Sequence, residues 1–189
     1  MTTATISQRP FTNKFTFGEP KLRTDGDIMM VAFGKDGWLY SIEELGVLRK
    51  WNPASGQQLD CTALSDMETI WAFSGDGRVV ASASDDVAIW DASAGRLLTS
   101  IPQTSWVTAL AFHPDPSFIA TGHDDGTIAY WDAPGHHAVF EKPLAFHKKA
   151  ISALAISPDG TALATGDWAG QVKLWDLAGQ TPRLKAHVH

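Results

Sequence analysis

Cysteine is almost absent from this chain, since Cys61 is the only one in 189 residues. A single thiol cannot form an intrachain disulfide, so the sequence predicts a protein of a reducing compartment, and we expect a cytoplasmic one. The first residues, Met1 to Thr5, lack the charged start and apolar centre of a secretory signal. No apolar run approaches the roughly 20 residues that a membrane-spanning helix needs. These absences favour a soluble globular protein.

Positive charge is also in short supply. Fifteen Lys and Arg residues stand against 21 Asp and Glu residues, which gives a formal net charge of −6. Because phosphate backbones are bound through basic patches, this balance argues against a nucleic acid partner. The sequence has no glycine-rich phosphate loop leading into a helix, and no segment with a sustained helical period. We expect no cofactor, and we interpret His136 and His137 as part of a solvated loop rather than a metal site.

Tryptophan, by contrast, is plentiful and recurs at a regular interval. Four of the eight tryptophans are followed by Asp or Asn, and each closes a segment of about forty residues. A fixed period of this length is the signature of a repeat architecture. The four pairs are Trp51-Asn52, Trp90-Asp91, Trp131-Asp132 and Trp175-Asp176.

A second landmark repeats upstream of each pair. It is an apolar residue followed three positions later by Asp, usually with Gly next. Asp-Gly between alternating apolar runs predicts a β-hairpin, because the turn needs a positive φ that Gly adopts at little cost. The four landmarks are Phe33 to Gly37, Phe73 to Gly77, Phe112 to Pro116 and Ile156 to Gly160.

The strands of each unit follow from these landmarks. In the last unit we expect strands over 151–156, 162–165, 172–175 and 182–186. The third unit repeats this plan over 107–112, 118–121, 127–131 and 138–144. Short, evenly spaced strands separated by turns indicate an all-β fold.

These residues give the chain a resemblance to WD40-repeat β-propellers, over about residues 25 to 189. The resemblance implies four four-stranded antiparallel blades packed radially, which would form half of a ring of seven or eight blades. We therefore predict an N-terminal extension over 1–21, a candidate blade-closing strand. It is followed by repeats over about 22–61, 62–101, 102–144 and 145–189.

The resemblance also implies a hydrogen-bond network of His, Ser or Thr, Asp and Trp inside each blade. The pattern predicts that no blade has the complete set. In the fourth repeat His147, Thr165 and Trp175 fit, but Ala169 stands where Asp is expected. In the first repeat Ile42 occupies the Ser or Thr position. In the second and third, Leu64 and Gln103 replace His, beside Ser82, Asp86 and Trp90, and beside Thr121, Asp125 and Trp131. We assign structural roles to Trp51, Trp90, Trp131, Trp175, Asp86, Asp125, His147 and Thr165.

Function is expected on the loops, because binding residues concentrate on loops held by a rigid scaffold. Trp106 and Trp168 lie outside the recurring tryptophans, and exposed aromatic side chains are typical interface anchors. The alternative for both is packing against a neighbouring blade. Equivalent or adjacent loop positions complete the predicted partner-binding set, which is Met67, Asp85, Trp106, Asp124, Lys149 and Trp168.

Two functions remain open on this sequence. The first is a non-enzymatic scaffold that binds other proteins or peptides through the loops. The second is a structural assembly unit that completes a propeller by homodimerisation or with another chain, and a fragment of a longer propeller is a third interpretation. Residues Phe11 to Phe17 alternate like a strand, and an unpaired strand edge favours association. An enzyme is least favoured, since only Asp85 and Asp124 offer ionisable groups at the expected site.

Overall fold

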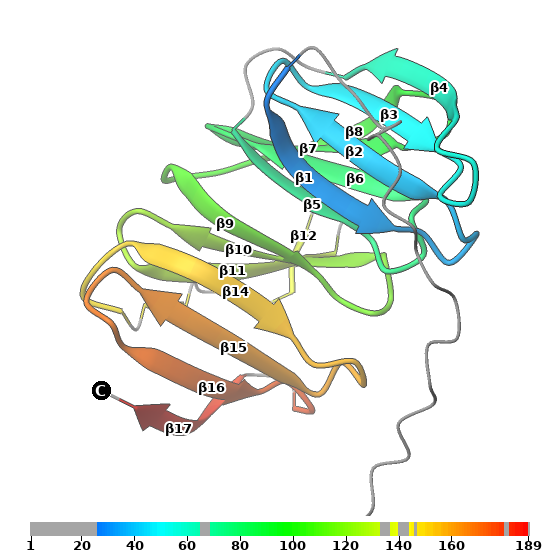
Figure 1. Ribbon diagram of the computed structural model, residues 1–189. Coiled ribbons are helices and arrows are strands. Elements are labelled where there is room, and N and C mark those ends of the chain that lie inside the picture. The colour runs from blue at the N-terminus through cyan, green and yellow to red at the C-terminus, as the bar shows by residue number, and fades with distance from the viewer. Residues whose placement is uncertain are drawn as a thin grey trace, which may run out of the picture.

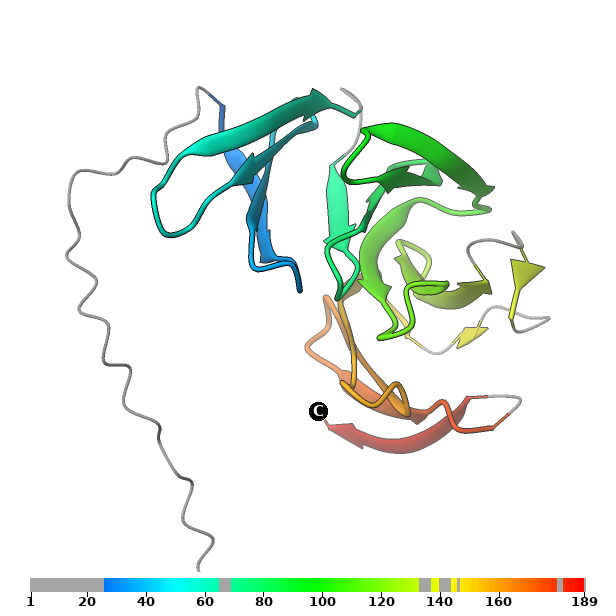
Figure 2. The same cartoon turned by 90° about the vertical axis from the view of Figure 1, so that its right-hand side faces the viewer.

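The computed structural model describes residues 26–64, 69–132, 137–139, 144, 145, 147–179 and 182–188. These residues form strands and turns and contain no helix, which confirms the predicted all-β class. The strands build four antiparallel sheets that follow one another along an arc (Figures 1 and 2). The predicted extension over 1–21 and the loop residue Met67 lie outside the described residues.

Each sheet is one blade, with its strands in chain order. Blade 1 contains β1 (Ile28–Phe33), β2 (Leu39–Glu43), β3 (Val47–Trp51) and β4 (Gln58–Ala63). Blade 2 contains β5 (Ile70–Phe73), β6 (Val79–Ala83), β7 (Asp86–Asp91) and β8 (Arg96–Pro102). Blade 3 begins with β9 (Val107–Phe112), β10 (Phe118–His123) and β11 (Thr127–Asp132). Blade 4 contains β14 (Ile151–Ile156), β15 (Ala162–Asp167), β16 (Val172–Asp176) and β17 (Arg183–Val188).

The outer edge of blade 3 departs from the expected single strand over 138–144. Two short strands, β12 (His137–Ala138) and β13 (Leu144–Ala145), each pair with β11. Ala138 lies opposite Trp131, whereas Ala145 lies opposite Thr127. Continuous pairing from Ala138 would reach Thr127 three residues earlier, so the chain between the two strands carries an insertion.

The two sides of every blade differ. On one side, here called the Trp face, the indole N–H of the recurring tryptophan donates to a Ser or Thr hydroxyl of the second strand. Side chains opposite each other in an antiparallel pair point to the same side, so the register assigns every strand residue to a face. The four indole bonds run from Trp51 to Ser41, Trp90 to Ser82, Trp131 to Thr121 and Trp175 to Thr165.

One packing rule joins the blades. The Trp face of each blade packs on the opposite, Trp-free face of the blade before it, and each joint holds one of three apolar cores. Apolar burial of this kind is the main favourable term in folding. Between blades 3 and 4, for example, the core joins Ala120, Ile128 and Tyr130 to Leu163 and Trp175. The other two joints follow the same plan.

The arc does not close. The inner strands follow one another, with β5 against β9 and β9 against β14. Figure 2 shows that blades 1 and 4 are separated by an open side, and Figure 1 looks into that side. The Trp face of blade 1 and the Trp-free face of blade 4 therefore lie at the two ends of the arc.

Candidate functional site on the loops of blades 3 and 4

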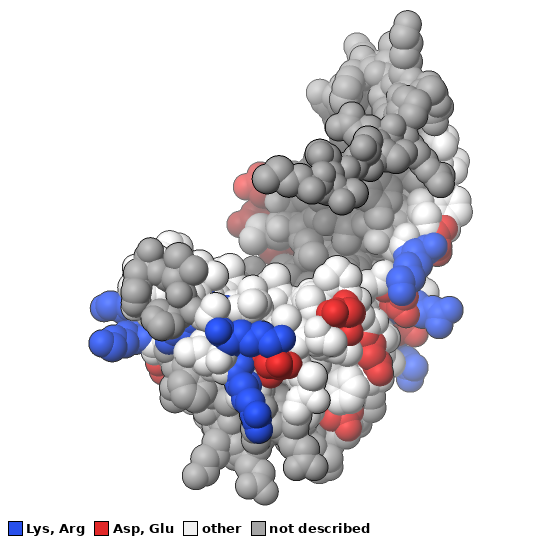
Figure 3. Space-filling model, turned by 90° about the horizontal axis from the view of Figure 1, so that it is seen from below, with Lys and Arg blue, Asp and Glu red and all other residues white. Residues whose placement is uncertain are grey.

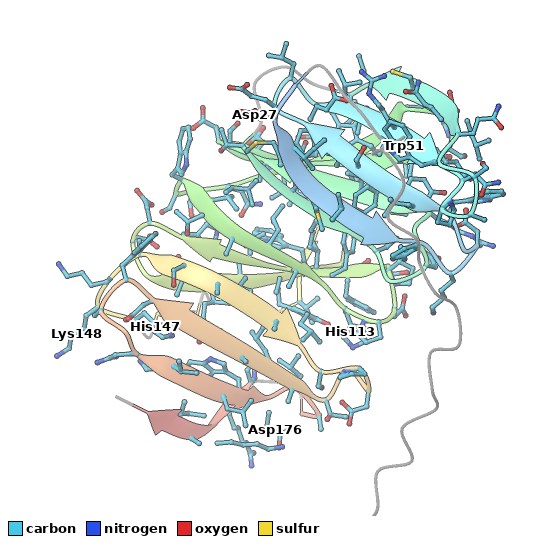
Figure 4. The ribbon with its side chains drawn as sticks, in the orientation of Figure 1. Asp27, Trp51, His113, His147, Lys148 and Asp176 are labelled. Atoms are coloured by element: carbon cyan, nitrogen blue, oxygen red, sulfur yellow. The ribbon has the colours of Figure 1, made fainter. Side chains whose placement is uncertain are left out.

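The loops gather at the two ends of the blades. One end carries the Asp-Gly turns between first and second strands. The other end, here called the loop face, carries the segments that lead into each blade and the turns between second and third strands. Figure 4 places His147 and Lys148 on the loop face of blade 4, with His113 and Asp176 toward the opposite end.

The loop face is tied together by one backbone hydrogen bond that recurs in three blades. The amide of the turn between second and third strands donates to the carbonyl of the residue before the first strand. These bonds also confirm that Trp106 and Ala150, and Asp124 and Trp168, occupy equivalent positions. The bonds are Glu44 to Asp27 at 2.9 Å, Asp124 to Trp106 at 3.0 Å and Trp168 to Ala150 at 3.1 Å.

A second recurring bond fixes the start of the segment that leads into the next blade. In blade 3 the turn glycine Gly126, with φ of 82°, accepts the amide of His147 through its carbonyl at 3.3 Å. In blade 1 Gly46 accepts the amide of Leu64 in the same way at 3.0 Å. A side chain on Gly126 would collide with the carbonyl of His147, so this turn both needs a positive φ and has no space for a Cβ.

In blade 2 a carboxylate side chain takes the place of this glycine carbonyl as the hydrogen-bond acceptor. Its Trp90 lies eight residues after Ser82, whereas the equivalent separation is ten in the other blades. The shorter turn has no glycine, and the carboxylate of Asp86 accepts the amide of Gln103 at 3.3 Å instead. Asp86 therefore fixes the start of the segment that leads from blade 2 to blade 3. No hydrogen bond described in blade 2 links it to Ser82 or Trp90, so its predicted place in the indole network was wrong.

The fourth blade contains a complete network, contrary to the expectation from Ala169. Asp167, two residues upstream, supplies the carboxylate and lies 2.9 Å from His147 Nδ1. His147 Nε2 lies 2.8 Å from Thr165 Oγ1, which accepts the indole N–H of Trp175 at 3.0 Å. Because a carboxylate only accepts, a neutral His147 carries its proton on Nδ1 and accepts the Thr165 hydroxyl at Nε2.

The charge of Asp167 is held in place by its neighbours. Burial opposes the charge, but the amides of Gln171 and Ala169 and the ring of His147 donate to this carboxylate, so the pKa of Asp167 lies below its ordinary value. The sequence signal that could have found it is the Thr-Gly-Asp order, with the carboxylate at the end of the second strand.

The first blade also differs from its prediction. Ser41, not Ile42, accepts the indole N–H of Trp51, at 2.8 Å. Ile42 points to the other face and is completely buried in the core with blade 2. Glu43, at the position equivalent to Asp167, binds the guanidinium of Arg49 on the neighbouring strand. The expected degeneracy of this blade came from an alignment shifted by one residue.

In the third blade His123 takes the place of Asp167. Its Nε2 lies 3.0 Å from Gln103 Oε1, and its Nδ1 lies 2.9 Å from Thr127 Oγ1. Burial lowers the pKa of His123 even though the Thr127 carbonyl and nearby carboxylates favour the charged ring. Asp125 accepts from Ser105 Oγ at 2.7 Å and from the Thr127 amide at 2.9 Å. Asp125 thus stabilises the turn, and its predicted place in the indole network was wrong.

Four of the six predicted partner-binding residues lie together on the loop face. The loop ridge is here defined as Trp106, Asp124, Lys149 and Trp168. Trp106 is bonded to Asp124, the turn of blade 3 abuts the Lys149 carbonyl, and Ala150 is bonded to Trp168. Trp168 is 77% exposed and Trp106 47%, so neither indole is buried between blades.

Two further residues bear on this surface. Asp85 is exposed on the loop face of blade 2, apart from the loop ridge. Leu45 in the turn between β2 and β3 is 66% exposed, and the sequence reasoning missed it. The sequence signal for it was a large apolar residue between Glu44 and Gly46 in a turn.

Several ionisable side chains near this surface are hydrogen-bonded within their blades. Among the described residues, no group of three or more His, Cys, Asp or Glu side chains is placed to hold a metal ion. His123 and His147 are buried and hydrogen-bonded within their blades. Figure 3 shows Lys and Arg interspersed with Asp and Glu on the face seen from below, without a basic patch. No helix in the described part of the chain is long and apolar enough to span a bilayer.

Comparison with protein families identifies the repeats. Residues 95–132 and 140–176 match the family model described as WD domain, G-beta repeat, WD40. The first segment runs from β8 of blade 2 to the end of β11, and the second includes β14, β15 and β16 of blade 4. The matches identify these two segments as WD40 repeats.

Its relatives include fungal nuclear distribution proteins. The chain is 35% identical over 57 residues to nuclear distribution protein nudF of Aspergillus flavus, which is 30% of this chain and 12% of that protein. It is 32% identical over 82 residues to nuclear distribution protein PAC1 of Arthroderma otae, or 42% and 18% of the two chains. It therefore spans less than a fifth of the length of these relatives.

Proposed function

We propose that this chain is a non-enzymatic interaction module that binds a partner protein or peptide through its loop ridge. The observation that carries the proposal is the exposure of Trp106 and Trp168 on turns fixed by recurring backbone hydrogen bonds. Binding sites are commonly built from loops on a rigid scaffold, and exposed tryptophans are frequent hot spots. Rigid turns also lower the entropy cost of association.

The charges around the two indoles favour a polar rim. Asp124 and Asp125 lie on one side of the joint between blades 3 and 4, and Lys148 and Lys149 lie on the other, all exposed. A central aromatic contact surrounded by exposed charges resembles the anatomy of a protein interface. The two relatives named above are nuclear distribution proteins. The proposal extends to a role in nuclear distribution only through the binding of a partner protein at the loop ridge.

The test compares Trp106→Ala and Trp168→Ala with the unmodified chain. A partner is first identified by capture from a cell extract and mass spectrometry, and its dissociation constant is then measured with purified protein. We expect each substitution to weaken binding by about tenfold or more, which corresponds to roughly 1.4 kcal/mol. Leu98→Ala removes an apolar side chain of similar exposure (45%) on the outer strand β8, and we expect it to bind normally.

Two results would contradict the loop ridge as the binding site. One is unchanged affinity in both tryptophan variants. The other is an equal loss in Leu98→Ala, since that would point to an effect on the whole fold. Thermal unfolding of every variant serves as the control for stability.

A second candidate function is a structural assembly unit completed by self-association or by another chain. It is supported by the apolar side chains that the open arc leaves exposed on blades 1 and 4. Contiguous exposed apolar surface commonly marks a protein interface.

A further inference from the structure

The Trp face of blade 1 carries exposed apolar side chains. Val31 and Phe33 on the inner strand β1 are 59% and 68% exposed. They lie opposite Ser41 and Leu39, and Ser41 accepts the Trp51 indole N–H, so both belong to the Trp face. The positions equivalent to Val31 and Phe33 in the other blades lie in apolar cores shared with the preceding blade. They are Trp71 and Phe73, Leu110 and Phe112, and Leu154 and Ile156.

The Trp-free face of blade 4 is exposed in the same way. Val172 and Leu174 on β16 are 51% and 38% exposed. The third-strand residues at these positions in blades 2 and 3 are no more than 8% exposed, because the following blade covers them. They are Val87 and Ile89, and Ile128 and Tyr130.

The two exposed faces match the two halves of an internal joint. Every internal joint sets apolar side chains of a Trp-free face against apolar side chains of a Trp face that include the recurring tryptophan. Blade 4 offers Ala153, Ala155, Val172 and Leu174, and blade 1 offers Val31 and Phe33. None of these side chains is charged, and the Glu43 and Arg49 side chains on the Trp face of blade 1 already form an ion pair with each other.

We propose that a second copy of this chain covers both faces, so that two arcs close a ring of eight blades. Blade 4 of each copy seats its Trp-free face on the Trp face of blade 1 of the other copy. The open arc in Figure 2 holds the two complementary faces at opposite ends, so one two-fold rotation forms both joints at once. Eight blades lie within the range of known propellers. This inference rests on the second candidate function and is independent of the loop ridge.

The first measurement is the solution mass by light scattering over a range of protein concentrations. A dimer of about twice 20.5 kDa is expected, dissociating on dilution. Leu174→Glu places a carboxylate on the blade 4 face, and Val31→Lys places an ammonium group on the blade 1 face. Each variant alone is expected to be a monomer, because a buried charge without a partner is strongly unfavourable.

Mixing the two variants tests the head-to-tail arrangement. In a mixed pair one joint sets Glu against Lys and the other joint is unmodified, so the mixture is expected to recover the dimer mass. Leu98→Glu on β8 is the matched control and is expected to remain dimeric alone. Circular dichroism and thermal unfolding establish that each variant is folded.

Three results would overturn the proposal: a monomer at all concentrations, a dimer that neither substitution weakens, or a mixture that stays monomeric. The loop ridge is tested separately, since Trp106→Ala and Trp168→Ala are expected to leave the mass unchanged. A monomeric chain whose partner binding still depends on these tryptophans would reject the ring and keep the interaction module. A dimer whose partner binding is unchanged in Trp106→Ala and Trp168→Ala would keep the ring and reject the loop ridge as the binding site.

Discussion

At the scale of the residue, one position distinguishes the blades. It follows the indole-binding Ser or Thr by two residues, and it holds Glu43, His123 or Asp167 in blades 1, 3 and 4. Each is buried, and each has a different partner, which is Arg49, Gln103 or His147 respectively. A buried polar group must be hydrogen-bonded, so each change at this position goes with a change in the partner.

Because of its burial, His123 makes stability depend on pH. Burial lowers its pKa below the ordinary 6.5, so below that pH the unfolded chain binds more protons than the folded chain. The stability that His123 contributes in its neutral form is complete above pH 6.5, and it is lost as the pH falls toward the pKa of His123 in the folded chain. We expect the free energy of unfolding, measured by urea denaturation, to fall as the pH is lowered from 7 through about 6.5 and below.

The matched variant for this prediction is His123→Gln, which keeps hydrogen-bonding capacity without titrating. Its free energy of unfolding is expected to be less pH-dependent over the same window. An identical slope in both proteins would assign the dependence to another group.

At the scale of the element, the turns between second and third strands determine how blades meet. Gly126 and Gly170 have φ of 82° and 80° at equivalent positions. The Gly126 carbonyl accepts the amide of His147 in the segment that leads into blade 4, and a Cβ added at Gly126 would meet the His147 carbonyl. A Cβ added at Gly170 would meet no described atom within 4 Å, since no further blade of the arc packs against this turn.

Substituting these two glycines separates backbone strain from crowding. Gly170→Ala is expected to cost only the strain of a left-handed residue, roughly 1–2 kcal/mol. Gly126→Ala carries the same strain and also pushes against blade 4, so it is expected to be the more destabilising by at least about 1 kcal/mol. Chemical denaturation measures the free energy of unfolding of both variants. An equal decrease in the two would mean that the backbone between blades 3 and 4 shifts to accommodate the added Cβ at little energetic cost.

At the scale of the whole molecule, each blade contacts only its neighbours along the arc, as in other repeat proteins. Blades 2 and 3 are covered on both faces, whereas blades 1 and 4 are each covered on one. Local opening is easiest where few buried contacts must be broken. The terminal blades are therefore the least stable parts of an isolated chain.

Hydrogen exchange measures this gradient. In dilute protein, amides of β6 and β10 are expected to exchange more slowly than the equivalent amides of β2 and β15. At concentrations where the mass doubles, β2 and β15 are expected to gain protection and β6 and β10 to change little. Uniform protection at all concentrations would contradict both the gradient and the ring.

The sequence by itself determined the all-β class and the repeat pattern. Its Asp-Gly turns and the Trp period reflect backbone needs that are local, since a positive φ and an alternating strand are readable within one segment. Most strands of the third and fourth repeats were accordingly predicted within two residues of their observed ends. The outer edge of blade 3 was not, because pairing across an insertion depends on the neighbouring strand.

Tertiary structure alone decided which polar side chains meet. Asp167 reaches His147 from twenty residues away, and Asp86 accepts the amide of Gln103, seventeen residues on and just after the outer strand β8. Such partners are brought together by packing between strands and blades, so motif spacing assigned Ala169 and Ile42 to positions that Asp167 and Ser41 fill. The exposure of the two faces at the ends of the arc is likewise a property of the assembled blades. The strands show the same alternation of apolar side chains whether or not another blade covers them, so the sequence pattern does not distinguish covered from exposed faces.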